Sequence, residues 1–354
     1  MINILFIGDL NEFGRSFQRC RTLNDLGNKV ATLSHTQIFP MGKIVAPSLG
    51  YRLLSKLRIP PDLTQVNKKM LQALQAETFD VIWIEKGNMI YPTTLRFAER
   101  YYPEIKLVSC SEDDMFARHG HSLFYRLGLK YYDVVFTTKK YNLDELKLLG
   151  ARCTRLFLDS FDEQVHQPMT LTSSAIKKFE CDVSAIGAYE KKRAESLLFL
   201  AVNGVRVIVW GGGWEKWHKS HPNMIIKNEF LFGDDYSKAI CATKVNLNFL
   251  RKSNRDEVTS RSIEIPACGG FMLTERTERH KHFFEEGKEA EFFASDEEML
   301  TKVRYYLEFN AERRQIALAG RERCLSSGYS TREQLIQMLD ALFSPKIKSN
   351  LISS

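Results

Sequence analysis

The stretch Asn254–Glu275 reads NRDEVTSRSIEIPACGGFMLTE and is the most informative part of the chain. It follows the apolar run Val245–Leu250, which predicts a strand. Thr259 or Ser260 is a preferred helix N-cap, and the glycine pair at 269–270 predicts the end of that short helix before a second strand. A strand, a helix and another strand in this order are typical of a parallel sheet covered by helices.

The first turn of this predicted helix offers groups that bind anions. Backbone N–H groups and the positive end of the helix dipole favour a diphosphate, and the Ser260 N–H and the Arg261 guanidinium would add hydrogen bonds to it. Glu264 lies one turn further on the same helix face, where its carboxylate can accept hydrogen bonds from a ribose diol. A capped surface helix with an Arg–Glu pair is the purely structural alternative. We favour the binding of a nucleoside diphosphate, because the whole segment and not only the Arg–Glu pair has this arrangement.

Apolar runs alternate with amphipathic stretches along the first half of the chain, as in the β-α-β units of a parallel sheet. A second series follows the polar segment Asp162–Lys178, which predicts an interdomain connection. We therefore predict an α/β protein with two doubly wound, Rossmann-like domains, at residues 1–170 and 171–330. By analogy, a C-terminal helix within 331–354 would cross back to the first domain. The predicted strands are Ile2–Gly8, Val30–Ser34, Asp80–Glu85, Lys106–Cys110, Asp133–Thr137, Thr154–Leu158, Asp182–Ile186, Arg206–Trp210, Val245–Leu250, Phe271–Thr274 and Glu291–Ala294.

The segment from Arg261 to Glu275, R-x-x-E-x-P-A-C-G-G-F-x-L-T-E, resembles group-1 glycosyltransferases of the GT-B fold, and in particular their spore-maturation-protein-like (CgeB-like) branch. The resemblance continues to about residue 335, but it is only fold-like in the first half. It implies two Rossmann-like domains that face a central cleft. Many retaining members carry two glutamates spaced E-x7-E. The second corresponds to Glu264, and Asp256 stands at the first, which implies a sugar contact and a catalytic role with a shorter reach.

Three further loops of the second half are candidates for the donor. The loop that starts at Gly187 leads to Arg193, at a position where related enzymes place phosphate-binding cations, although a solvated basic helix start is an equal alternative. Gly213 lies in a triple-glycine turn that would let the backbone approach a nucleotide, or would serve as a flexible turn. Gly233 lies where the fold holds the base; a loop with a helix cap is the alternative.

In the first half, Asp9 follows the first predicted strand in GDLNEFG, whose glycine spacing differs from the dinucleotide fingerprint and argues against a dehydrogenase. The resemblance makes Asp9 a candidate base, and a helix-capping aspartate is the alternative. Glu85, Asp113 and His119 lie after two further strands and are acceptor-side candidates. Acidic residues near histidines can bind a metal or exchange protons. Because the resemblance implies that dipoles and cations stabilise the leaving diphosphate, we expect no metal.

The composition fits an ordinary globular protein, with 44% hydrophobic and 26% charged residues among 354. The net charge of +7 is spread evenly, with 22 basic and 18 acidic residues at 1–175 and 28 and 25 in the remainder, so we expect no nucleic-acid partner. Seven scattered cysteines and no leader-like start favour a reduced, cytoplasmic protein. The basic, apolar stretch Lys43–Arg58 predicts peripheral contact with the inner face of a membrane, or a partly buried loop-helix pair.

These patterns together lead us to expect a metal-independent, retaining glycosyltransferase. Its donor would be a nucleotide-diphosphate sugar, with a UDP-sugar favoured, and it would hold no tightly bound cofactor. Its acceptor would be a cell-surface glycan, a lipid-linked sugar or a protein. A sugar-nucleotide epimerase of the same fold and a non-catalytic nucleotide-sugar-binding scaffold stay open as alternatives.

Overall fold

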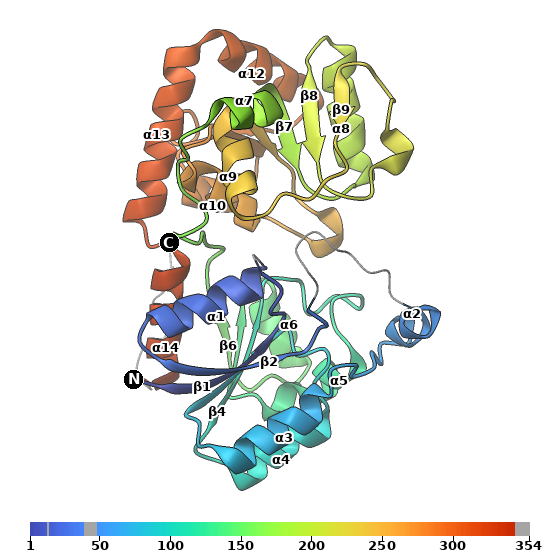
Figure 1. Cartoon of the computed structure of the whole chain (residues 1–354), viewed down its shortest axis with the longest axis vertical. Helices are drawn as coiled ribbons and strands as arrows, with labels where there is room; N and C mark the ends of the chain where they lie inside the picture. The colour runs from blue at the N-terminus through green and yellow to red at the C-terminus, as the bar shows by residue number, and fades with distance from the viewer. Residues whose placement is uncertain (13, 39–47, 344–354) are drawn as a thin grey trace. The chain divides into compact units, whose positions relative to one another are not determined.

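The computed structural model describes residues 1–12, 14–38 and 48–343. The chain divides into two compact units, Met1–Leu158 together with the segment that begins at Arg332, and Asp159–Thr331. The boundary between the two units thus lies at residues 158–159, whereas the sequence predicts it at residues 170–171. Each unit contains one six-stranded, parallel sheet with helices packed against it (Figure 1).

The sheet of the first unit has the strand order β2-β1-β3-β4-β5-β6. The chain runs from β1 outward to β2 and then returns to β3 on the other side, so the order reverses between β1 and β3. The strands are β1 (Asn3–Gly8), β2 (Lys29–Ser34), β3 (Val81–Glu85), β4 (Lys106–Ser111), β5 (Val134–Thr137) and β6 (Thr154–Leu156). The helices are α1 (Arg15–Asp25), α2 (Leu49–Lys56), α3 (Val66–Ala76), α4 (Pro92–Tyr101), α5 (Leu123–Gly128), α6 (Asn142–Leu148) and the C-terminal α14 (Thr331–Phe343).

Side chains alternate between the two faces of this sheet along each strand. Helices cover both faces, so both are buried. Leu5 and Ile82 belong to the core cluster under α3 and α4. Phe6 and Trp83 belong to the cluster on the other face, which α1 and α14 complete. The C-terminal helix contributes Leu335, Met338 and Leu339 to that second cluster, so the core of the first unit contains the last described helix of the chain.

The sheet of the second unit has the order β12-β11-β10-β7-β8-β9 and reverses between β7 and β10. Its strands are β7 (Cys181–Ile186), β8 (Val207–Trp210), β9 (Met224–Ile226), β10 (Thr243–Asn248), β11 (Met272–Glu275) and β12 (Glu291–Phe293). Its helices are α7 (Ser173–Phe179), α8 (Lys191–Val202), α9 (Gly233–Ala242), α10 (Ser260–Ala267), α11 (Glu278–Phe283), α12 (Asp296–Glu308) and α13 (Asn310–Ser326). The ligand crevice of a doubly wound sheet lies where the order reverses.

Each strand expected from the sequence forms, with bounds that shift by one or two residues. One strand was not expected, because β9 has only three residues and follows the polar stretch His218–Asn223. It pairs with β8 alone at the edge of the second sheet. The polar connection at 162–178 ends in α7, whose Ala175 and Phe179 pack against Trp210 of the second sheet.

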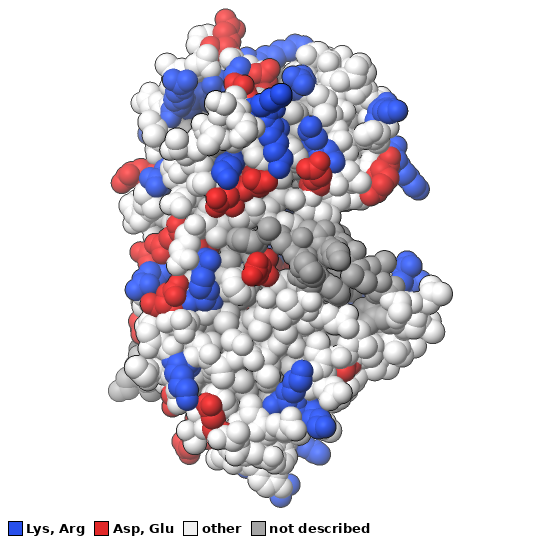
Figure 2. Space-filling model, in the orientation of Figure 1, with Lys and Arg blue, Asp and Glu red and all other residues white. Residues whose placement is uncertain are grey.

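Charges of both signs lie over the surface of the described residues. On the face drawn in Figure 2, Lys and Arg side chains are interspersed with Asp and Glu side chains on both units. Among the described helices, none is both long enough and apolar enough to cross a bilayer. Part of the stretch 43–58, residues 43–47, lies outside the described residues. Within the remainder, α2 exposes Leu49, Leu53 and Leu54.

Helix α13 packs so closely against the backbone at Glu289 that only glycine fits at position 320. A Cβ at Gly320 would lie 2.3 Å from the carbonyl oxygen of Glu289, which is backbone and cannot swing away. We expect Gly320→Ala to lower the free energy of unfolding by about 1–3 kcal/mol, because overpacking outweighs the better helix propensity of alanine. Chemical denaturation checks this.

Gly50 of α2 provides the matched control, since no described atom beyond its chain neighbours and its own helix backbone lies within 4 Å of a Cβ built there. Gly50→Ala should leave the free energy of unfolding unchanged or raise it by up to about 1 kcal/mol. Equal denaturation midpoints for the Gly320→Ala protein and the unmodified protein would contradict the close packing of α13.

Candidate functional site

Two arginines converge on one glycine where the second sheet reverses its order. Gly187 directly follows β7, Arg193 lies in the first turn of α8, and Arg261 lies in the first turn of α10. A Cβ at Gly187 would lie 2.7 Å from Nη1 of Arg193 and 3.6 Å from Nη2 of Arg261. The absence of a side chain at this position therefore leaves room for both guanidinium groups.

Arg193 is 5% exposed, and its guanidinium lies over the ring of Phe249. It donates hydrogen bonds to the carbonyl oxygens of Ala188 and Phe249. Burial and the neighbouring charge of Arg261 lower the pKa of Arg193 to about 10. Within the described parts of the chain, neither arginine has a carboxylate partner. Two such cations close together, with little water around one of them, favour an anion beside them.

The start of α10 is fixed by a chain of hydrogen bonds. Thr259 caps the helix, and its N–H donates to Oγ of Ser262 at 3.2 Å. His280 is fully buried; its Nδ1 lies 2.8 Å from the carbonyl oxygen of Glu275 and its Nε2 lies 2.8 Å from Oγ of Ser262. A carbonyl oxygen only accepts, so Nδ1 carries the proton and Nε2 accepts from the Ser262 hydroxyl. The neutral imidazole thus orients the hydroxyl that holds the helix start.

Glu264 lies on α10 with its carboxylate held from two sides. The Tyr236 hydroxyl donates to Oε2 at 2.6 Å, and Nε2 of His166 lies 3.7 Å from Oε1. The N–H of Asp162 donates to Nδ1 of His166, so the proton of the neutral ring is on Nε2 and faces Glu264. Glu264 itself is 6% exposed. These contacts fix the direction in which its carboxylate points.

Asp256 lies in the loop between β10 and α10, and its side chain is fully buried. Arg251 contacts one carboxylate oxygen at 3.0 Å and the amide of Asn254 donates to the other at 2.6 Å. The structure thus places this carboxylate inside its own loop. Ser260, the first residue of α10, is half-buried, and its hydroxyl lies 3.4 Å from Oδ1 of Asp159.

The two remaining glycines of the predicted donor site lie in different places. Gly213 lies next to Tyr189, since a Cβ there would be 3.3 Å from the Cβ of that residue. Its turn is joined to the Gly187 loop, because the Trp214 indole donates to the carbonyl oxygen of Gly187 at 3.0 Å. Gly233 has a positive φ of 51° and begins α9, the helix that carries Tyr236.

In the first unit, three of the four sequence-predicted side chains have partners within that unit. Oδ1 of Asp9 accepts hydrogen bonds from Asn11 and from the Thr36 hydroxyl, so it braces its own loop. Glu85 forms a buried ion pair with Arg19 at 2.7 Å. The other two candidates differ in environment: Asp113 pairs with the half-exposed Lys86, and His119 is exposed.

The acidic and histidine residues of this first unit are of the types that can ligate a metal ion. Across residues 1–12, 14–38 and 48–343, no group of three or more His, Cys, Asp and Glu side chains gathers closely enough to hold a metal ion. The seven cysteines are free thiols.

One known protein family is similar to this chain, mainly in the second unit. A family model described as glycosyl transferase-like matches residues 192–340, which include α8, α10 and the site around Arg261. No curated protein sequence matches the chain.

Solved structures match nearly the whole chain. The Anabaena protein HepE in complex with UDP and glucose is 13% identical, with 97% of this chain and 100% of that chain covered and a TM-score of 0.64. Sucrose-phosphate synthase from Thermosynechococcus elongatus is 12% identical over 97% and 99%, with a TM-score of 0.65. A UDP-N-acetylglucosamine 2-epimerase from Listeria monocytogenes is 12% identical over 100% and 99%, with a TM-score of 0.56. The chain therefore has the two-domain, Rossmann-like GT-B fold, as its sequence predicts.

Several residues that build the site carry no sequence signal of their own. His280 precedes the family-like segment that begins at His282, and nothing in its sequence neighbourhood connects it to Ser262. Tyr236 follows Gly233 in the chain without a signal that connects it to Glu264. Both side chains reach the site through contacts between residues distant in sequence, which a local pattern does not reveal.

The buried His280 makes the second unit sensitive to acid. Burial lowers the pKa of His280 from 6.5 to about 4, so the unfolded chain takes up its proton at a higher pH than the folded one. This contribution to stability is fully present above about pH 6.5 and is lost as the pH falls to about 4, which amounts to about 3 kcal/mol.

We expect the unfolding free energy of the unmodified protein to fall more steeply over this range than that of His280→Gln, whose side chain does not titrate. Denaturant titrations at a series of pH values measure both. A difference between the two proteins that is the same at pH 7 and at about pH 4 would contradict a neutral, buried His280.

Proposed function

We propose that the protein transfers a sugar from a nucleoside-diphosphate donor to an acceptor. The observation that supports this most is the pair Arg193 and Arg261 at Gly187, where the second sheet reverses its order. A diphosphate leaving group develops negative charge as the glycosidic bond breaks, and preorganised cations and N–H groups stabilise that charge. The match of residues 192–340 to the glycosyl transferase-like model supports the same reaction.

In this proposal the diphosphate lies between the two arginines and the start of α10. The backbone N–H of Ser260 and the helix dipole add to the charge of Arg261. Glu264 accepts hydrogen bonds from the ribose hydroxyls, and Tyr236 with His166 holds its carboxylate in position. UDP is the favoured nucleotide, because the similar HepE structure has UDP and glucose bound. Gly187, Gly213 and Gly233 would give the donor close access to the backbone.

Asp256 acts as a positioning residue for the sugar in this scheme. Its carboxylate holds Arg251 and Asn254, so it sets the loop that leads into α10. By the E-x7-E resemblance we propose retention of the anomeric configuration, without a metal. Asp9 stays the proposed catalytic base, and the proposed acceptor-side groups stay Glu85, Asp113 and His119. The spore-maturation-protein-like branch stays the proposed subfamily.

The two parts of the nucleotide can be tested separately. Arg261→Gln should weaken both UDP and inorganic pyrophosphate by roughly ten- to hundredfold, because a charge-assisted contact to the diphosphate is lost. Glu264→Gln should weaken UDP about tenfold and leave pyrophosphate unchanged, because only the nucleoside contact is affected. Glutamine keeps an oxygen that accepts from Tyr236. Titration calorimetry measures these affinities.

A comparison of UDP with 2′-deoxy-UDP serves as the internal control for Glu264. The unmodified protein should prefer UDP, and Glu264→Gln should lose most of that preference. If Arg261→Gln, Glu264→Gln and the unmodified protein bind UDP with equal affinity, α10 is not part of the donor site.

A second candidate function is sugar-nucleotide epimerisation, favoured by the structural likeness to the Listeria epimerase. A thermal-shift screen over nucleotide sugars identifies the donor, because a ligand that binds the native state raises the midpoint. The selected donor is then incubated with and without acceptor pools. UDP release that depends on an acceptor supports transfer, whereas an epimerised nucleotide sugar formed without any acceptor identifies an epimerase.

A further inference from the structure

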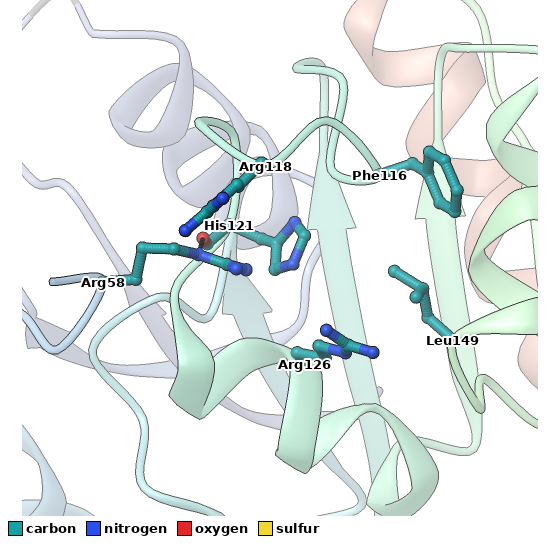
Figure 3. A pocket seen from close by; sticks show the side chains of 6 residues that line it. All are labelled: Arg58, Phe116, Arg118, His121, Arg126 and Leu149. Carbon is teal, nitrogen blue, oxygen red and sulfur yellow. Dashed lines mark hydrogen bonds between the residues drawn. The ribbon is translucent and has the colours of Figure 1, made fainter. Parts of the chain in front are cut away.

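A basic cavity lies in the first unit and contains none of the residues of the proposed donor site. It has a volume of about 450 Å³ and is lined by Arg58, Phe116, Arg118, His121, Arg126 and Leu149 (Figure 3). Most of these side chains come from the loop that follows β4 and from α5 after it. The volume falls within the range of small-molecule sites, and four of the six side chains are basic.

The loop that carries Arg118 and His121 is rigidly built. Oδ1 of Asp114 accepts from the N–H groups of Phe116 and Ala117, and the N–H of Gly120 donates to Ala117. A Cβ at Gly120 would lie 2.0 Å from the carbonyl oxygen of Asp114, so only glycine fits there. The cavity wall is thus a defined surface.

Two buried nitrogen atoms of the cavity have no hydrogen-bond partner among the described residues. They are Nη2 of Arg58 and Nε2 of His121, and His121 is 6% exposed. Buried polar atoms are nearly always paired in native proteins, so each of these two atoms is expected to bind a water molecule or a ligand. Nε of Arg58 donates to the carbonyl oxygen of His121 at 3.1 Å, which ties the two side chains to the same wall.

The arginines repel one another without a compensating carboxylate. Burial and the charges of Arg118 and Arg126 lower the pKa of Arg58, and burial and Arg58 lower the pKa of His121. Within the described residues, none of the three arginines forms an ion pair. Arg58 also has a left-handed backbone, with φ at 64°, which costs free energy in a non-glycine residue. An anion in the cavity would remove the repulsion.

We propose that this cavity binds a phosphate group, and specifically a phosphomonoester. Arginine guanidinium groups match phosphate oxygens in pairs. Nδ1 of His121 donates to the carbonyl oxygen of Ala117, so Nε2 of the neutral ring is an acceptor that faces the cavity. A phosphomonoester has a second ionisation near neutral pH and can therefore present both anionic oxygens and a P–OH donor. A role of this phosphate on the sugar acceptor rests on the proposed transfer, but binding itself does not.

The test is titration calorimetry of the full chain with inorganic phosphate near neutral pH, without nucleotide. Arg118→Gln and Arg126→Gln change exposed side chains, so both variants should fold. Each should weaken the binding by about tenfold or more. Arg96→Gln, on the exposed surface of α4, is the matched control and should bind phosphate as the unmodified protein does. Arg261→Gln should also retain this binding event, which separates it from the donor site.

The outcomes decide the proposal. Absence of phosphate binding, or equal binding by Arg118→Gln and Arg96→Gln, overturns it, and a normal UDP titration in the same sample shows that the donor proposal is unaffected. Sulfate, which has no proton to donate near neutral pH, should bind several-fold more weakly; equal affinity would overturn the choice of a phosphomonoester.

A second arm identifies the molecule that carries the phosphate. The exposed Leu49, Leu53 and Leu54 of α2 precede Arg58 in the chain, and apolar side chains of this kind bind to a lipid surface. Sedimentation with phosphatidylcholine vesicles that contain phosphatidic acid, lost in Arg118→Gln, assigns a lipid phosphomonoester. Binding of inorganic phosphate without vesicle binding assigns a soluble phosphorylated ligand. Either result supports the phosphate cavity.

Discussion

The repulsion between Arg193 and Arg261 is the constraint on which the second unit depends. Two guanidinium groups share the space left by the missing side chain of Gly187, and one of them is almost fully buried. The protein tolerates this because backbone carbonyl oxygens and the ring of Phe249 partly offset the charge of Arg193. The fixed start of α10 then adds a third positive element. These three positive elements lie together at the point where the second sheet reverses its order.

The first unit contains two clusters of charged side chains that differ in how their charges are balanced. Arg19 lies between Glu85 and Glu112, and Arg15 adds a further contact, so cations and carboxylates balance in a structural network. A few residues further along, the arginines around His121 have no such balance. Residue types alone do not distinguish the two clusters. The two clusters differ in the number of carboxylates that the fold places within hydrogen-bond distance. The Arg19 cluster has such partners and stabilises the fold, whereas the cluster around His121 lacks them and is the proposed phosphate site.

Much of this architecture could be predicted from the sequence, because alternating apolar runs report directly on buried strands. The family-like segment also located Arg261 and Glu264, since a helix start after a strand has a local signature. Asp256 shows what the sequence leaves out: the resemblance predicts a sugar contact for it, and the partners Arg251 and Asn254 of its carboxylate come only from the structure. Partners distant in sequence, such as His280 for Ser262, depend on helix packing. No local pattern encodes that packing.

The place of α14 in the core has a consequence for how the protein is made. One face of the first sheet, with Phe6 and Trp83, is covered in part by Leu335, Met338 and Leu339 from the far end of the chain. During synthesis the N-terminal unit emerges first, yet this face cannot be completed until the last helix has left the ribosome. The second unit, continuous in sequence from Asp159 to Thr331, can complete its core earlier. The half that is translated first is therefore the half that finishes folding last.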